Sequence, residues 1–240
     1  VTIIVAKPGY GTKRVHAAPG NDPTVVFLNA KPYVDSVRIT STHQSHWFPV
    51  EDEYYITIRA HIDDPDGLND IDSVWFGFND PEIILPVSQP FPSDGWVEAE
   101  LFDWELSTPI TDLIGRPLFT NILDADSLSS EPHGSFITRF IEATPVPISP
   151  VNDSEVDAAP TLRWDYFTAS FTFFYSVEIF RITSGNTTTL VYSRDAITQE
   201  FAEHTVADSL PAGSYYWTLG VTDILGNSSH SREATFTVTP

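Results

Sequence analysis

The stretch Leu210–Ser229, LPAGSYYWTLGVTDILGNSS, contains one complete strand with a turn at each end. Large apolar side chains alternate in it with small or polar ones, and a period of two is typical of a strand with one buried face. Leu-Pro-Ala-Gly precedes the strand, and Asp-Ile-Leu-Gly-Asn follows it as a polar turn. The alternation predicts an inward-facing set that consists of Tyr215, Trp217, Leu219 and Val221.

This stretch resembles the F strand of a fibronectin type III domain, in the form that is common in bacterial surface proteins. The run IleSerPro-Val-Asn-Asp, which ends at Asp153, resembles the A strand that opens such domains. The resemblance covers residues 145–240, whereas residues 31–144 resemble a generic bacterial immunoglobulin-like domain. It implies an all-β chain of two tandem β-sandwiches, and it identifies a fold without specifying a function.

Proline-rich sequence at Thr144–Pro150 separates the two predicted domains. Proline cannot donate a hydrogen bond to a sheet and favours extended geometry, so the segment predicts a stiff connector between an extended pair of domains. The predicted organisation is an N-terminal extended segment over 1–30, an Ig-like sandwich over 31–144 and a fibronectin type III-like sandwich over 145–240. Within the first segment, residues 2–5 and 25–28 are candidate short strands.

Alternation of apolar residues also predicts strands in the first sandwich, near residues 54–62, 74–78, 83–87 and 96–102. A short helical turn is expected at residues 112–116. A weak internal repeat aligns Leu118, Ile122 and Asp124 with a second triplet at the same mutual spacing, Trp217, Val221 and Asp223. The repeat predicts that residues 118–124 form the F strand of the first sandwich.

Composition excludes several classes of protein. The formal net charge is −21, which argues against nucleic-acid binding because that function needs a basic face. The sequence has no cysteine, so no disulfide or thiolate chemistry is expected. It has no apolar run of membrane-spanning length, so no direct membrane insertion is expected. We expect an extracellular or cell-surface location in a bacterium, as a secreted protein or lipoprotein whose signal or anchor has been removed.

Five aspartates within Asp63–Asp72, DDPDGLNDID, form the most distinctive chemical feature. Calcium is a hard cation that takes 6–8 oxygen ligands, and carboxylates on a loop between strands can supply them. The candidate ligands are Asp63, Asp64, Asp66 and Asp70. The alternative is that Asp-Pro-Asp-Gly serves only as a turn between two strands. No cofactor is otherwise required.

Three tryptophans are candidate contacts for a glycan or a protein partner, because strand parity does not place them in a core. They are Trp75, Trp96 and Trp104. Flat indole faces can stack on sugar rings, although large aromatic side chains also cover open sheet edges. The sequence contains no nucleophile motif and no phosphate-binding glycine loop, so no enzyme activity is expected.

Three hypotheses of function remain open. The leading hypothesis is a non-enzymatic extracellular module pair that spaces, presents or binds other domains of a bacterial surface or secreted protein, including a role in adhesion. Its partner would be an unknown protein or a polysaccharide. The alternatives are a carbohydrate-binding accessory region of a secreted polysaccharide-degrading enzyme and an adhesin segment stiffened by calcium.

Overall fold

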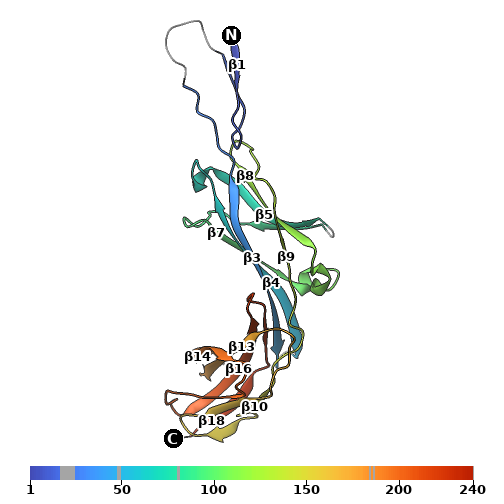
Figure 1. Cartoon of the computed structure of the whole chain (residues 1–240). Coiled ribbons are helices and arrows are strands. Elements are labelled where there is room, and N and C mark those ends of the chain that lie inside the picture. The colour runs from blue at the N-terminus through green and yellow to red at the C-terminus, as the bar shows by residue number, and fades with distance from the viewer. Residues whose placement is uncertain (17–24, 48–49, 80–81, 184, 186, 240) are drawn as a thin grey trace. The chain divides into compact units, whose positions relative to one another are not determined.

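The computed structural model describes residues 1–16, 25–47, 50–79, 82–183, 185 and 187–239. Within these residues the regular elements are β-strands and three short 3-10 helices. The chain divides into two compact units, each built from several segments. Unit 1 is Val1–Ile39, Thr57–Leu101 and Gly115–Ile137, and unit 2 is Thr40–Ile56, Phe102–Ile114 and Thr138–Pro240. The elements are drawn in Figure 1.

In the described part of the chain, nine strands precede the proline-rich segment. They are β1 (Thr2–Val5), β2 (Lys13–His16), β3 (Tyr33–His46), β4 (Glu51–Asp63), β5 (Ile71–Asn79), β6 (Glu82–Val87), β7 (Trp96–Phe102), β8 (Pro117–Asp124) and β9 (His133–Phe136). The 3-10 helices are η1 (Leu68–Asp70), η2 (Asp103–Glu105) and η3 (Ile110–Leu113). The expected helical turn at residues 112–116 therefore begins earlier in the chain, at Ile110.

Unit 1 has the strand order of a fibronectin type III-like sandwich. One sheet has the order β6-β5-β8-β9, and β3, β4 and β7 are neighbours in a second sheet. Alternate residues of each strand are buried between the layers, including Ile58 on β4, Phe76 on β5 and Leu118 on β8. Trp75 lies on the opposite face of β5 from this core, as its parity predicts.

The first thirty residues differ in part from expectation. Residues 2–5 do form a strand, and it pairs antiparallel with Lys13–His16. Residues 25–28 are not a strand, so that part of the prediction is wrong. Residues just after this segment instead contact the segment that follows β1. Tyr10 and Ala30 form an isolated β-bridge, and the Gly11 amide donates to the Asn29 carbonyl at 2.8 Å.

Nine further strands complete unit 2. They are β10 (Pro147–Ser149), β11 (Ser154–Val156), β12 (Thr161–Trp164), β13 (Phe173–Ile182), β14 (Thr188–Thr198), β15 (Glu203–Thr205), β16 (Gly213–Asp223), β17 (Ser228–His230) and β18 (Ala234–Val238). One sheet has the order β10-β12-β15, and β13 pairs with both β14 and β16 in the other. This is again the sandwich topology of a fibronectin type III-like domain.

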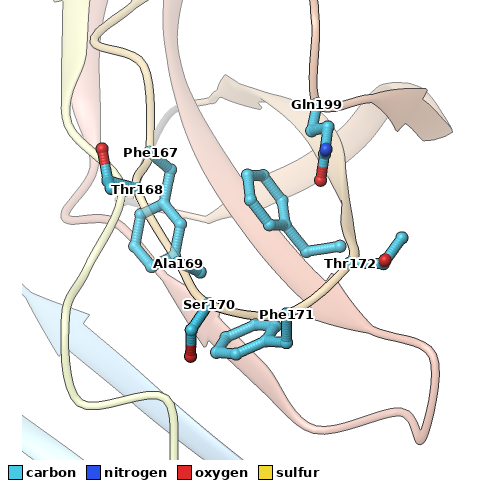
Figure 2. A pocket seen from close by; sticks show the side chains of 8 residues that line it. Phe167, Thr168, Ala169, Ser170, Phe171, Thr172 and Gln199 are labelled. Carbon is cyan, nitrogen blue, oxygen red and sulfur yellow. The ribbon is translucent and has the colours of Figure 1, made fainter.

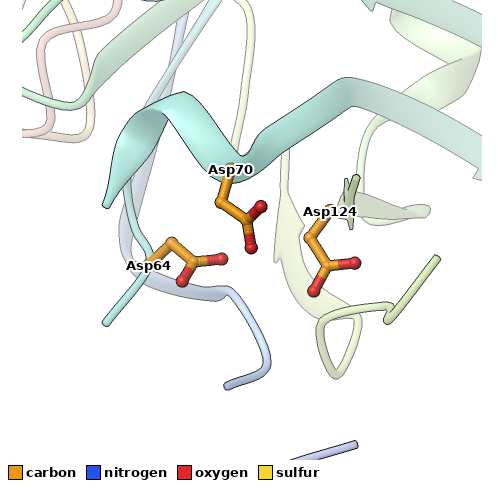
Figure 3. A group of neighbouring side chains, drawn as sticks. All are labelled: Asp64, Asp70 and Asp124. Carbon is orange, nitrogen blue, oxygen red and sulfur yellow. The ribbon is translucent and has the colours of Figure 1, made fainter. Parts of the chain in front are cut away.

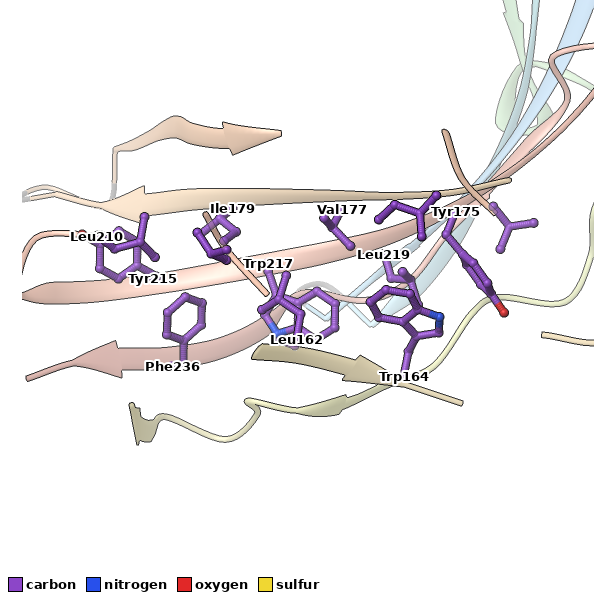
Figure 4. Close-up of a cluster of buried hydrophobic side chains, with 14 of the residues drawn as sticks. Leu162, Trp164, Tyr175, Val177, Ile179, Leu210, Tyr215, Trp217, Leu219 and Phe236 are labelled. Carbon is purple, nitrogen blue, oxygen red and sulfur yellow. The ribbon is translucent and has the colours of Figure 1, made fainter. Parts of the chain in front are cut away.

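The core of unit 2 confirms the predicted parity of the Leu210–Ser229 stretch (Figure 4). Tyr215, Trp217, Leu219 and Val221 are all 0% exposed. The Tyr215 hydroxyl donates to the Pro211 carbonyl at 2.6 Å, the arrangement known as a tyrosine corner. The indole N–H of Trp217 donates to the Pro150 carbonyl at 2.8 Å. Both aromatic side chains therefore place their apolar bodies in the core and satisfy their polar atoms.

Residues 40–56 group with unit 2 rather than with the remainder of the expected first domain. Thr42, His43 and Gln44 of β3 pair in parallel with β17. The Ser41 amide also donates to the Asn227 side chain at 3.1 Å. These hydrogen bonds join segments that are 186 positions apart, which a local pattern does not encode. The domain limits of 31–144 and 145–240 therefore stay a prediction from the sequence. The contacts within the fold divide the chain differently, into unit 1 and unit 2.

Candidate metal centre

The loop after β4 is shaped by a glycine. Gly67 has φ +104°, a region that favours glycine, and its amide donates to the Asp64 carbonyl at 2.8 Å. The Asp70 amide in turn donates to the Gly67 carbonyl at 2.9 Å, which closes the short η1 turn. The turn brings Asp64 and Asp70 to the same side of the loop (Figure 3).

A second loop adds a third carboxylate. Asp124 ends strand β8, and the Ala125 amide donates to the Asp70 carbonyl at 2.7 Å, which ties the two loops together. Asp64, Asp70 and Asp124 each offer an oxygen within 4.8 Å of the other two. Calcium–oxygen distances are about 2.3–2.6 Å, so oxygens bound to one ion lie up to about 5 Å apart. The three carboxylates are therefore close enough to share one cation (Figure 3).

Two carboxylate oxygens in this cluster have no hydrogen-bond partner although they are buried. They are Oδ2 of Asp64 and Oδ2 of Asp70. Asp64 is only 3% exposed, and its other oxygen accepts the Asp66 amide at 2.8 Å. A buried carboxylate oxygen without a donor is costly, and a metal ion is one of the few partners that removes that cost. Asp64 thus points an unsatisfied oxygen into an acidic cluster.

Burial raises the pKa of the Asp64 carboxyl, and the negative charges of Asp70, Asp66 and Asp124 raise it further, against the Asp66 amide, which lowers it. No ion pair with a Lys, Arg or His reaches the three carboxylates of the cluster among the residues that the structure describes. A divalent cation would supply the missing positive charge. The donors are all oxygen, which suits Ca²⁺ or Mg²⁺ and does not suit zinc or copper.

The other two predicted ligands are used elsewhere. Asp63 accepts the Tyr33 hydroxyl at 2.7 Å and the Asp64 amide at 2.8 Å. Asp66 accepts the Ala30 amide at 2.6 Å. Neither belongs to the group of three. Of the four predicted ligands, that group contains Asp64 and Asp70. Asp124 was not among the ligands predicted from the sequence, although the internal repeat placed it at the end of an F strand.

The repeat provides an internal comparison for Asp124. The Asp124 amide donates to the Leu128 carbonyl at 3.0 Å, and the Leu128 amide donates back to Oδ1 of Asp124 at 2.7 Å. In unit 2 the same two bonds join Asp223 and Asn227, at 2.9 Å and 2.9 Å. The two turns therefore share a hydrogen-bond pattern, at positions that the internal repeat aligns.

The charges around the two turns are opposite. Oδ2 of Asp223 lies 3.3 Å from Nε of Arg139, so a guanidinium neutralises it. Oδ2 of Asp124 accepts a neutral donor, the Asn29 side-chain amide, at 2.8 Å, and it lies beside two more carboxylates. Beside the turn in unit 1 lie two more carboxylates, those of Asp64 and Asp70, whereas beside the turn in unit 2 lies the Arg139 guanidinium. A cation bound in unit 1 would neutralise the excess negative charge there.

A pH titration without metal tests the environment of Asp64. Because its pKa is raised in the folded state, the folded state binds the proton more tightly than the unfolded state does. The free energy of unfolding of unit 1 is therefore expected to fall as the pH rises from the ordinary aspartate pKa of about 3.9 through the raised value. Urea unfolding in EDTA between about pH 4 and pH 7 measures this.

The matched variants are Asp64→Asn and Asp72→Asn. The first should flatten the difference between acidic and neutral pH and make unit 1 more stable at neutral pH in EDTA. The second removes a charge from an exposed residue of the same segment and should preserve the wild-type slope. A wild-type slope in Asp64→Asn would show that another group causes the pH dependence.

The three candidate tryptophans have separate surroundings. The ring of Trp96 is covered by the Arg59 guanidinium, 4.5 Å from the ring centroid, and lies 5.0 Å from the His61 ring. Trp104 is 72% exposed in unit 2 and stacks on Phe102 at 5.6 Å. Trp75 lies in unit 1 and lines a pocket on a sheet face. The structure places Trp75 and Trp96 in unit 1 and Trp104 in unit 2.

A larger pocket of about 530 Å³ lies in unit 2 (Figure 2). Its lining is the loop 167–173 together with Gln199. The polar groups there are hydroxyls and one amide, and no ionisable side chain is part of the lining that the structure describes. General acid–base catalysis needs a positioned titratable group, so this pocket offers no catalytic arrangement.

No protein-family model matches this sequence, and no curated protein matches it. Among solved structures, the fibronectin(III)-like modules of Clostridium thermocellum CbhA share 12% identity, with 86% of this chain and 92% of that chain covered and a TM-score of 0.38. The FN1–FN3 domains of chicken CNTN1 share 11% identity, with 88% and 65% covered and a TM-score of 0.29. The strand order of each unit carries the fold assignment. Among the described residues, no helix has the length and hydropathy needed to cross a membrane.

Proposed function

We propose that the chain is a non-enzymatic pair of modules from an extracellular or cell-surface bacterial protein, and that Ca²⁺ bound by Asp64, Asp70 and Asp124 stabilises unit 1. The observation that carries the calcium site is the buried, unpartnered oxygen of Asp64 within the cluster of three carboxylates. A spacing or presenting role is favoured by two filled sandwich cores and by a large pocket without titratable groups.

Calcium is preferred over magnesium for a geometric reason. The three carboxylates come from two loops, and each offers one oxygen within 4.8 Å of the other two, so the remaining ligands of a bound ion would be water or further oxygens. Calcium accepts irregular ligand geometry, whereas magnesium keeps several waters and requires a near-ideal octahedron. The extracellular location expected for the chain also provides millimolar calcium, which suits modules with Kd values of about 0.1–1 mM.

Thermal unfolding with calcium tests this proposal. We expect about 10 mM Ca²⁺ to stabilise unit 1 relative to EDTA by about 1.4–2.7 kcal/mol, which corresponds to free calcium at roughly 10 to 100 times Kd. The transition of unit 2 should not move. Magnesium at the same concentration should produce a smaller shift.

Asp64→Asn and Asp124→Asn should each remove the calcium shift, because each loses a charged ligand. Asp63→Asn and Asp72→Asn should retain it, since their carboxylates lie outside the group of three. The absence of any calcium shift in the wild-type protein would refute the metal site and leave the loop as a structural turn.

A further inference from the structure

The outer face of the β6-β5-β8-β9 sheet in unit 1 contains a pocket of about 350 Å³. The register places Gly77 of β5 between Ile84 of β6 and Phe119 of β8, and it places Trp75 beside Asn121. These side chains have the parity opposite to the buried Phe76 and Leu118, so they project away from the core. We name this site the sheet-face pocket and define it by Trp75, Gly77, Ile84, Phe119 and Asn121.

Gly77 forms the floor of the sheet-face pocket, and nothing in the backbone requires a glycine there. Its φ is outside the positive range, and a Cβ atom built on it would contact only the Ile83 carbonyl, at 3.4 Å. Glycine in the interior of a strand weakens the strand, and it often marks a place where a ligand approaches the backbone. The missing side chain leaves an open space between the aromatic residues.

The lining suits a neutral, partly apolar ligand. Trp75 and Phe119 provide aromatic surface, and Ile84 is 58% exposed beside them. Asn79 and Asn121 add amide groups that both donate and accept hydrogen bonds. Among the lining residues that the structure describes, none carries a charge, although the whole chain has a formal net charge of −21. Ligand sites are typically apolar and aromatic with a few polar groups that fix orientation.

We propose that the sheet-face pocket binds a hexopyranose unit of a neutral polysaccharide. A pyranose ring has an apolar C–H face that stacks on an aromatic ring, and its hydroxyl groups at the rim pair with amides such as those of Asn79 and Asn121. The absence of charge in the lining matches a neutral sugar and disfavours uronic or sulfated glycans. A pocket for one ring implies weak affinity, with a Kd on the order of 0.1–1 mM per site.

Affinity electrophoresis of the full chain tests this inference, because migration in a native gel detects weak binding to a dissolved polymer. The gels contain hydroxyethyl cellulose, mixed-linkage β-glucan or galactomannan as neutral hexopyranose probes and polygalacturonate as an anionic one. We expect at least one neutral probe to retard the protein and the anionic probe to leave its migration unchanged. Normal migration in all three neutral gels, or stronger retardation by the anionic probe, would overturn the proposal.

Gly77→Val is the most informative variant. Valine favours a strand, so the fold should be retained, while its side chain fills the floor of the pocket. We expect Gly77→Val and Trp75→Ala each to weaken retardation at least tenfold, with thermal melting used to confirm that unit 1 remains folded. Trp104→Ala, which removes an exposed tryptophan of unit 2, should bind as the wild type does. Full retardation of Gly77→Val would show that the polysaccharide binds elsewhere.

Discussion

Replacing Trp217 by alanine is expected to lower the free energy of unfolding of unit 2 by about 3–5 kcal/mol, the range for a large aromatic removed from a core. Trp217 is 0% exposed, and its indole N–H donates to the Pro150 carbonyl. The substitution would leave a cavity in the core beside the middle of strand β16, and it would leave the Pro150 carbonyl without its donor. Chemical denaturation of unit 2, followed by circular dichroism, measures the loss.

The neighbouring residue is the matched control. Tyr216 lies on the outer face of the same strand and stacks on Phe180 with ring centroids 4.9 Å apart. Tyr216→Ala should cost only about 1 kcal/mol, since it removes a cross-strand pair and no core volume. Equal costs at positions 216 and 217 would mean that the inward and outward faces of β16 are assigned incorrectly.

Asp223→Ala is expected to destabilise unit 2 by about 3–4 kcal/mol, because it removes a buried carboxylate whose hydrogen bonds contribute about 1.5–3 kcal/mol each. Asp223 is 5% exposed and holds the turn after β16. Its carboxylate accepts the amides of Leu225 and Asn227 and pairs with the Arg139 guanidinium at 3.3 Å. Urea unfolding with and without calcium should give the same cost, because this carboxylate already has a cationic partner.

Asp124→Ala makes the comparison that the internal repeat permits. In EDTA its cost should be clearly smaller than that of Asp223→Ala, because relief of repulsion with Asp64 and Asp70 offsets the lost bonds from Leu128 and Asn29. In calcium its cost should rise, because the wild type gains a ligand that the variant cannot bind. Equal costs for both variants in EDTA would contradict the unbalanced charge inferred for unit 1.

Local patterns predicted much of each sandwich from residues alone. The alternation around Trp217 gave the buried face of β16, and the alternation at residues 54–62 gave that of β4. Both succeed because the side-chain period of a strand is two, so the sequence of one strand reports which face is buried. The alignment of Asp124 with Asp223 also identified two turns with the same hydrogen bonds.

Which apolar segments form strands, and which strands pair, depends on the contacts that the tertiary fold makes between distant segments. Residues 25–28 are apolar enough for a strand, but their backbone is irregular in the folded unit. Residues 40–46 continue a regular strand, and Thr42, His43 and Gln44 within it pair with β17, far along the chain. Whether an apolar segment becomes a strand depends on finding a hydrogen-bonding partner, and the partner is a property of the fold and not of the segment.

For the proposed metal centre, the sequence predicted an acidic loop after a strand, with Asp64 and Asp70 among the possible ligands. The grouping of Asp64 and Asp70 with Asp124 depends on the tertiary fold. Asp63 and Asp66 are engaged by Tyr33 and Ala30, whereas Asp124 joins from a different loop. Spacing along a loop fixes side chains relative to their own backbone, whereas this group of three draws its carboxylates from two loops that meet only in the folded unit.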